Sequence, residues 1–141
     1  MELPFSILGE GENFVRSVYL YCEERKVTAY SFIAETSGKV HKKIMCMLKL
    51  ILQTQYPLCE PYVKHFSVER YKNLYELRLR ADGRMVRIIY TIEGESLILL
   101  HAFYKHNKRD TERALEYALK LQKNMDVSHL QLLESLLEVN A

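Results

Sequence analysis

The stretch that decides the fold is LYELRLRADGRMVRIIYTIEGESLILLHAFYKHNK, residues 74–108. It contains three successive runs rich in strand-forming residues. Two short turns separate the runs, one at Asp82-Gly83 and one at residues 93–95. Turns this short join antiparallel neighbours. The stretch therefore predicts three consecutive antiparallel strands.

Alternation along these strands separates an apolar face from a cationic one. The first strand has apolar residues at alternate positions, which are Tyr75, Leu77 and Leu79. The second strand has a similar set, which is Val86, Ile88, Tyr90 and Ile92. Because successive side chains of a strand point to opposite faces, the intervening residues share the other face. A small sheet would gather four cations there: Arg78, Arg80, Arg87 and Lys105. Guanidinium groups bind phosphate oxygens in a bidentate way, so this face suits a phosphate-rich partner.

The distribution of charge points to the same region. Residues 70–109 contain nine lysines and arginines and four acidic residues, whereas the rest of the chain contains eleven and fourteen. The net charge of +2 thus divides into +5 for this region and −3 for the remainder. A basic patch on one face is the electrostatic footprint of nucleic-acid binding, and an ordinary solvated sheet face is the alternative.

Before this region, the sequence predicts one strand and two helices. The strand covers Phe14–Cys22, which is rich in β-branched and aromatic residues. A short helix covers Thr28–Thr36 and is closed by Ser37-Gly38. A longer helix covers Lys39–Gln55, where apolar residues recur with a 3.6-residue period, and Pro57 ends it.

After this region, two further helices are expected. The first is capped by Asp110 or Thr111 and has an apolar side of Ala114, Leu115, Ala118 and Leu119. The second spans residues 127–139, with a capping box of Ser128 and Gln131. Its apolar side consists of Leu130, Leu133, Leu136 and Leu137. These leucines must be buried, and we expect the domain's own core to bury them. The alternatives are docking near the basic sheet or a subunit contact that forms a homodimer.

Grouped helices and grouped strands, rather than alternating ones, indicate an α+β protein. We expect residues 1–141 to form a single domain around a mainly antiparallel sheet of about four strands. The helices should cover one face of this sheet, and the cations should lie on the open face or its rim.

The sequence also bounds the compartment and the cofactors. No apolar run approaches the ~20 residues that span a bilayer, and Glu2 stands where a signal peptide would be positively charged. We therefore expect a cytoplasmic protein. The three cysteines, which are Cys22, Cys46 and Cys59, lack CxxC spacing, and this favours reduced thiols over a zinc site. With no glycine-rich phosphate loop and no histidines at ligand spacing, we expect neither a cofactor nor a metal.

The motifs of this region resemble the RelE/HigB superfamily, most closely the phage-derived HigB-type toxins of bacterial type II toxin–antitoxin pairs. The resemblance rests on LYELR at 74–78, RIIY at 87–90 and LLHAF at 99–103, followed by Lys105 and an alanine-rich helix. It spans about Thr28 to Lys123. It implies the same α+β fold and a helix-turn-helix antitoxin protein as partner.

The resemblance further implies a ribosome-dependent endoribonuclease that cuts messenger RNA without a metal. In that chemistry the ribose 2′-hydroxyl attacks the adjacent phosphorus and expels the 5′-oxygen, which requires a base, an acid and fixed cations. Correspondence with the family's motifs makes Arg78, Arg87 and Lys105 expected catalytic residues, and His106, which departs from the pattern, is a fourth because it can titrate near neutral pH. Five further residues are expected to bind RNA: Arg80, Arg84, Phe103, Lys108 and Arg109.

Several of these residues have a structural interpretation as well. Arg78 adjoins Glu76 and could form an ion pair with it, whereas Arg87 is expected to be exposed. His106 stands where the family often has a second lysine, so it is either an acid–base group or a surface histidine. His101 is expected to be a hydrogen-bonded core histidine. The tyrosine that some relatives use as a base has only weak counterparts here, Tyr104 and Tyr117.

Two alternatives to the nuclease stay open. ParE-like toxins share this superfold but poison DNA gyrase by binding it, and the fold alone does not decide the function. The other alternative is a degenerate toxin that is retained only to bind its antitoxin.

Overall fold

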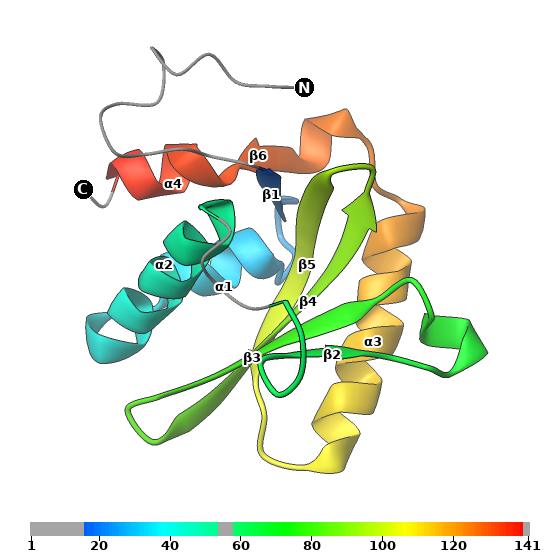
Figure 1. The fold of residues 1–141 in the computed structure, drawn as a ribbon. Helices are drawn as coiled ribbons and strands as arrows, with labels where there is room; N and C mark the ends of the chain where they lie inside the picture. The colour runs from blue at the N-terminus through cyan, green and yellow to red at the C-terminus, as the bar shows by residue number, and fades with distance from the viewer. Residues whose placement is uncertain (1–15, 54–57, 140–141) are drawn as a thin grey trace.

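The computed structural model describes residues 16–53 and 58–139, with side chains up to residue 136. These residues form a six-stranded sheet with helices on both faces (Figure 1). The strands are β1 (Ser17–Tyr21), β2 (Val63–His65), β3 (Tyr75–Ala81), β4 (Arg84–Glu93), β5 (Ser96–Tyr104) and β6 (Leu130–Leu132). The helices are α1 (Ala29–Glu35), α2 (Gly38–Leu52), α3 (Lys108–Lys123) and α4 (Leu133–Val139), with 3-10 turns η2 (Glu69–Tyr71) and η3 (Val127–His129). The α+β prediction is confirmed. None of the helices in these ranges combines the length and apolar content needed to cross a membrane.

In the described part of the chain the strands are arranged in the order β2-β3-β4-β5-β1-β6. These six strands exceed the predicted number of about four. Neighbouring strands are antiparallel except β1 and β5, which run parallel, so the mainly antiparallel prediction holds. The strands missed by prediction, β2 and β6, have three residues each. Alternation cannot distinguish so short a strand from a loop. Residues 14 and 15 of the predicted first strand lie outside the described residues.

Two tight turns connect β3, β4 and β5, as predicted. Asp82 and Gly83 have φ angles of 52° and 76°, and positive φ at both central residues is the pattern of a type I′ hairpin turn. Glycine adopts this region without strain, and aspartate is one of the few other residues that tolerate it. The turn sets the register of the hairpin, which places Arg78 opposite Arg87.

One face of the sheet is covered by α1 and α2. Thr28 caps α1 in a capping box with Ser31, while Ser37, expected to close α1, is the N-cap residue of α2. The apolar stripe of α2 is buried: Val40, Ile44, Met47, Leu48, Ile51 and Leu52. It belongs to one cluster with the apolar face of the hairpin, including Leu77, Leu79, Val86 and Ile88. Gln55 and Pro57, the predicted end of this helix, lie outside the described residues.

The opposite face is covered by α3, so the prediction that the helices share one face is wrong (Figure 1). Helix α3 buries Ala114, Leu115, Ala118 and Leu121. These residues join a second cluster with Ile89, Ile98 and Leu100 of the sheet. The reason lies in β5, where residues 97–100 are each at most 4% exposed. A strand with apolar side chains on both faces has to be covered on both.

The start of α3 also differs from the prediction of Asp110 or Thr111 as the cap. Asn107 is the N-cap residue, and its side chain accepts a hydrogen bond from the Asp110 N–H at 3.2 Å. The Asp110 carboxylate accepts in return from the Asn107 N–H at 3.0 Å. Asp110 is therefore the capping-box partner, and Lys108 and Arg109 lie in the first turn of the helix.

The C-terminal segment differs from the single helix predicted at 127–139. Residues 130–132 form β6, which pairs antiparallel with β1, and α4 begins only at Leu133. Pairing with the edge of β1 outweighs the helical spacing of the leucines, as tertiary context commonly outweighs local propensity. Leu133 and Leu136 are buried in the same cluster as α1 and α2. The expectation that this segment packs on the protein's own core is thus confirmed.

The predicted capping box of Ser128 and Gln131 is wrong for the same reason. Asp126 is the N-cap residue of η3, and its partner in the box is His129. The Ser128 N–H donates to the Asp126 carboxylate at 2.8 Å. Gln131 instead lies within β6.

Candidate nucleic-acid interface

The predicted cations of the sheet lie in two neighbouring rows across β3, β4 and β5. The first row consists of Arg78, Arg87 and Phe103, which are direct cross-strand neighbours. The second row, nearer the hairpin turn, consists of Arg80, Met85 and Lys105. The Lys105 N–H donates to the Met85 carbonyl at 2.9 Å, so Lys105 continues the register of β5. These cationic rows lie on the face opposite α1 and α2, as the alternation predicted. That face is not the open one expected, because α3 covers part of it, packing on Ile89 and Leu100.

A buried carboxylate stands beside the first row. Arg78 Nε donates to Glu76 Oε1 at 3.1 Å, and Arg87 Nε lies 3.7 Å from the same oxygen. The Glu76 side chain is 1% exposed, that of Arg87 13% and that of Arg78 31%. The ion pair considered between Arg78 and Glu76 is present. Arg87, expected to be exposed, is largely buried, because its Nη1 folds back to donate to the Val86 carbonyl at 3.1 Å.

Burial has an electrostatic consequence for Arg87. Desolvation lowers the pKa of its guanidinium, the Glu76 carboxylate opposes this shift, and the charges of Arg78 and Arg80 add to it. Arginine stays protonated in proteins, so the row keeps its charge. The first row therefore holds two cations in a partly dehydrated setting, where their interaction with an anion is screened less than in water.

Arg84 lies apart from the cationic rows. Its guanidinium carbon sits 3.4 Å from the centroid of the Tyr104 ring, and that ring also packs against Phe32 of α1 at 4.9 Å. This contact is on the α1 side of the sheet. Tyr117, the other weak candidate for a base, donates its hydroxyl to the Val27 carbonyl at 2.7 Å. Neither tyrosine is brought to the rows.

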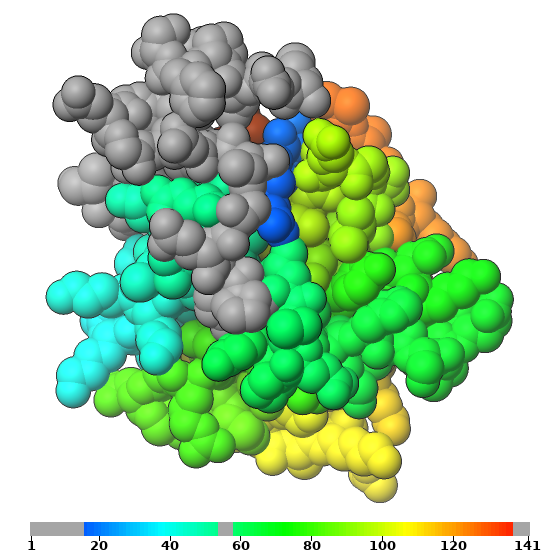
Figure 2. Space-filling view, in the orientation of Figure 1, coloured from blue at the N-terminus to red at the C-terminus, as the bar shows by residue number. Residues whose placement is uncertain are grey.

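The positive surface continues from Lys105 into the start of α3. His106 has a side chain that is 75% exposed, and its N–H donates to the Asp110 carboxylate at 2.7 Å. Backbone hydrogen bonds from His106 and Asn107 lower the pKa of Asp110, which keeps it ionised. Lys108 and Arg109 are exposed. Figure 2 shows the hairpin tip and the start of α3 meeting at the lower edge of the molecule.

Other basic residues of this region form ion pairs of their own. Arg70 makes a two-pronged contact with Glu116 on α3, through Nε and Nη2 at 2.6 Å each, and the Tyr71 hydroxyl donates to the same carboxylate. Together they hold the pKa of Glu116 at about 2. Lys72 pairs with Glu69 at 2.8 Å. The local excess of charge is thus concentrated in the cationic rows and the start of α3.

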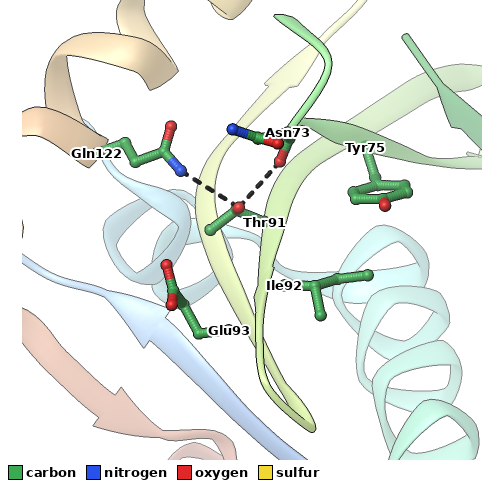
Figure 3. Close-up of a pocket in the computed structure, with 6 residues that line it drawn as sticks. All are labelled: Asn73, Tyr75, Thr91, Ile92, Glu93 and Gln122. Atoms are coloured by element: carbon green, nitrogen blue, oxygen red, sulfur yellow. Dashed lines mark hydrogen bonds between the residues drawn. The ribbon is translucent and has the colours of Figure 1, made fainter. Parts of the chain in front are cut away.

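A shallow pocket of about 250 Å³ lies at the other end of β4. It is lined by Asn73, Tyr75, Thr91, Ile92, Glu93 and Gln122 (Figure 3). The buried Thr91 hydroxyl donates to the Asn73 carbonyl at 2.9 Å and accepts from Gln122 Nε2 at 3.2 Å. These bonds tie α3 to the segment before β3. No lysine or arginine is among the residues that line the pocket, so it is separate from the cationic rows.

Two residues behave differently from the sequence-based expectation. Glu76 was not among the predicted site residues, although its signal was present as one acid alternating with two arginines along β3. His101 is partly exposed, but its Nδ1 is buried without a hydrogen-bond partner among the described residues. The imidazole is held by ring contacts to Phe103 at 5.8 Å and Tyr117 at 4.8 Å, and burial lowers its pKa to about 4.

Fold and site together define an α+β protein whose mixed sheet carries clustered cations on one face. A model of the phage derived protein Gp49-like family (DUF891) matches residues 31–123, well over half of the chain. The chain therefore belongs to this family, a toxin-like family of toxin–antitoxin systems. The matched residues include both cationic rows and run from within α1 to the end of α3. Searches of the curated proteins and of the solved structures found no match.

Proposed function

We propose that this protein is the toxin of a type II toxin–antitoxin pair and that it cuts messenger RNA on the ribosome. The observation that carries the proposal is the direct cross-strand pair of Arg78 and Arg87, with Arg80 and Lys105 in the neighbouring row. Like charges directly opposite each other destabilise a sheet. We infer that this pair serves to bind an anion. A phosphate group is the anion whose oxygens two guanidinium groups can bind in a bidentate way.

In the proposed reaction the ribose 2′-oxygen forms a bond to phosphorus while the bond from phosphorus to the 5′-oxygen breaks. The products are a 2′,3′-cyclic phosphate and a free 5′-hydroxyl. The proton of the 2′-hydroxyl passes to a base, and another proton is delivered to the departing 5′-oxygen. Arg78 and Arg87 stabilise the charge that develops on the phosphoryl oxygens. No metal is needed for these steps.

The remaining residues have supporting roles in the proposal. Lys105 and Arg80 bind the scissile and flanking phosphates, and Phe103 at the end of the first row offers a ring on which a base can stack. Lys108 and Arg109 extend the phosphate contacts along the strand of RNA. His106 assists proton transfer at the exposed edge of the site.

Ribosome dependence follows from the weakness of the acid–base groups. The cationic rows supply positive charge but no exposed carboxylate or tyrosine that could act as the base. The carboxylate beside them, Glu76, is buried. A substrate already bent into in-line geometry compensates for this, since positioning alone can supply ~7–11 kcal/mol. We propose that messenger RNA in the ribosomal decoding site is that substrate, and that a helix-turn-helix antitoxin blocks the reaction.

Expression of the chain alone in a bacterium tests the proposal. We expect growth arrest together with new 5′ ends within translated messages, mapped by primer extension. Arg84→Ala is a matched control because it removes a basic residue from the other side of the same hairpin, and it should arrest growth as the parent does. Growth arrest with intact messages and cleaved DNA would replace the nuclease with a gyrase poison. Unimpaired growth at full expression would identify an inactive antitoxin-binding relative.

A further inference from the structure

The Glu76 carboxylate occupies an unusual setting for a charged group. It is 1% exposed, yet only Oε1 contacts the neighbouring arginines. Its Oε2 is buried without a hydrogen-bond partner among the described residues. Its cross-strand neighbours are Lys64 and Ile89, and the Lys64 ammonium lies over the Phe66 ring at 5.4 Å. An incompletely satisfied buried carboxylate destabilises a fold, so its presence needs a reason other than stability.

The geometry supplies that reason. Arg78 and Arg87 are directly opposite each other, and one Glu76 oxygen lies within 3.1 Å and 3.7 Å of their Nε atoms. A negative charge at that point offsets the repulsion between the two guanidinium groups. The hydrogen bond from Arg78 Nε restricts the rotation of the Arg78 guanidinium plane. Arg87 Nε makes no hydrogen bond with the described residues, so Glu76 acts on Arg87 through charge at 3.7 Å, while the bond from Nη1 to the Val86 carbonyl holds the group. Fixed cations stabilise a transition state better than mobile ones, since they do not reorganise during the reaction.

We propose that Glu76 is a positioning residue that holds Arg78 and Arg87 side by side for the scissile phosphate. This inference rests on the proposed nuclease function. Glu76 does not act on the substrate directly, because its buried oxygens cannot reach a 2′-hydroxyl at the surface. Its effect on the reaction passes through the two arginines.

Glu76→Gln is the informative variant, because glutamine keeps the shape and an acceptor oxygen but removes the charge. The rate of messenger cleavage is measured in single-turnover reactions over a range of concentrations of ribosomes that carry a message. We expect the maximal rate to fall about 10–100-fold, the effect of a small displacement of catalytic groups. The ribosome concentration at half-maximal rate should change much less, because Arg80 and Lys105 retain their contacts.

Glu116→Gln provides the matched control. Glu116 also binds an arginine, Arg70, through a two-pronged contact, but it lies on α3 outside the cationic rows. Loss of this ion pair should leave the maximal rate unchanged. If Glu76 served stability alone, Glu76→Gln would lower the unfolding midpoint and leave the maximal rate per folded molecule at the parent level, and that result would overturn the proposal.

A second comparison tests whether Glu76 acts through the arginines. In an Arg78→Ala, Arg87→Ala background, Glu76→Gln should have almost no further effect on the residual rate, because nothing remains to be positioned. Independent tenfold losses in both backgrounds would show that Glu76 acts on the reaction by another route, and would overturn the positioning role.

Solvent exchange of the arginine Nε–H groups, followed by ¹⁵N NMR, separates this inference from the proposed function. Arg78→Lys and Arg87→Lys assign the two signals. For the Arg78 Nε–H, which donates to Glu76, we expect slow exchange in the parent and fast exchange in Glu76→Gln, with no change in Glu116→Gln. A parent that leaves ribosome-bound messages intact would refute the nuclease, and the exchange rates would then decide by themselves whether Glu76 orders the arginines. Unchanged exchange in Glu76→Gln would refute the positioning.

Discussion

The two faces of the β3–β4 hairpin differ in what they bury. The face toward α1 and α2 buries apolar side chains throughout, among them Leu77, Leu79, Val86 and Ile88. The other face also buries Ile89 against α3, but beside it lie the charged Glu76 and most of Arg87. Replacing buried ion pairs with apolar residues is often neutral or stabilising, so the charged face is not the more stable arrangement. One face thus buries apolar side chains, whereas the other adds the charged groups on which the proposed function rests.

The sharpest test of this contrast uses neighbouring residues of β4 that point to opposite faces. We expect Arg87→Ala to lower the cleavage rate on ribosomes by about 10²–10³-fold, the effect of removing one preorganised group that stabilises transition-state charge. Because Arg87 is largely buried, the variant should also lose stability, so rates are compared per folded molecule. Ile88→Val should cost ~0.5–1.5 kcal/mol of stability in urea unfolding and keep the parent rate. Equal rate losses in both variants would break the contrast.

His101, on the α3 side of the sheet, makes the stability of the folded protein depend on pH. Burial lowers its pKa to about 4 in the folded protein, whereas a histidine in the unfolded chain titrates near ~6.5. Between these values the unfolded chain binds a proton that the folded chain does not. Stability should therefore fall as the pH falls through this window, by up to about 3 kcal/mol.

The measurement is urea unfolding at pH 7 and pH 5. His101→Phe should lose less stability on acidification than the parent, because it removes the group that titrates. Phe103→Leu, which removes a stacking ring but keeps the imidazole, should retain the parent's sensitivity to acid. Parallel behaviour of the parent and His101→Phe would assign the acid sensitivity to other groups.

His106 tests how far the chemistry extends beyond the sheet. We expect His106→Ala to weaken cleavage about 10–100-fold, within the lower part of the range for an acid–base group. His106→Lys should retain toxicity, because it restores a cation beside Lys105. Cleavage rates on ribosomes and growth curves check both variants. Complete loss in both would make His106 indispensable, whereas full activity in both would make it a bystander.

The smallest effect is expected at Arg84, on the apolar side of the hairpin. Arg84→Ala removes the stacking contact with Tyr104, which should cost ~0.5–1 kcal/mol of stability. The cleavage rate should stay at the parent level. A rate loss comparable to that of Arg87→Ala would show that RNA also reaches this side of the hairpin.

Local signals were sufficient to predict the centre of the fold. Alternation identified β3 and β4, and Asp82-Gly83 identified the turn, because both depend on residues adjacent in sequence. The pairing of Arg78 with Arg87 follows from that turn. The gathering of cations on one face was predictable for the same reason.

Features set by distant contacts were not predictable. The spacing of the apolar residues in α3 showed that the helix is amphipathic. It did not show which face of the sheet the helix covers. Leu130 fits the helical spacing of the later leucines, yet residues 130–132 form a strand because they pair with the edge of β1. The burial of Arg87 and the contact of Glu76 with both arginines depend on side-chain placement across two strands, which periodicity alone does not show.

The position of β1 has a consequence for synthesis of the protein. β1 is made before the other described strands, yet its partners in the sheet are β5 and β6, which are 79 and about 110 residues further along the chain. At a translation rate of ~5–20 residues per second, β1 waits several seconds or more for its first neighbour. Contacts this distant in sequence also slow folding, because the loop must close before they form. A nascent copy therefore lacks its finished sheet until almost the whole chain has emerged from the ribosome.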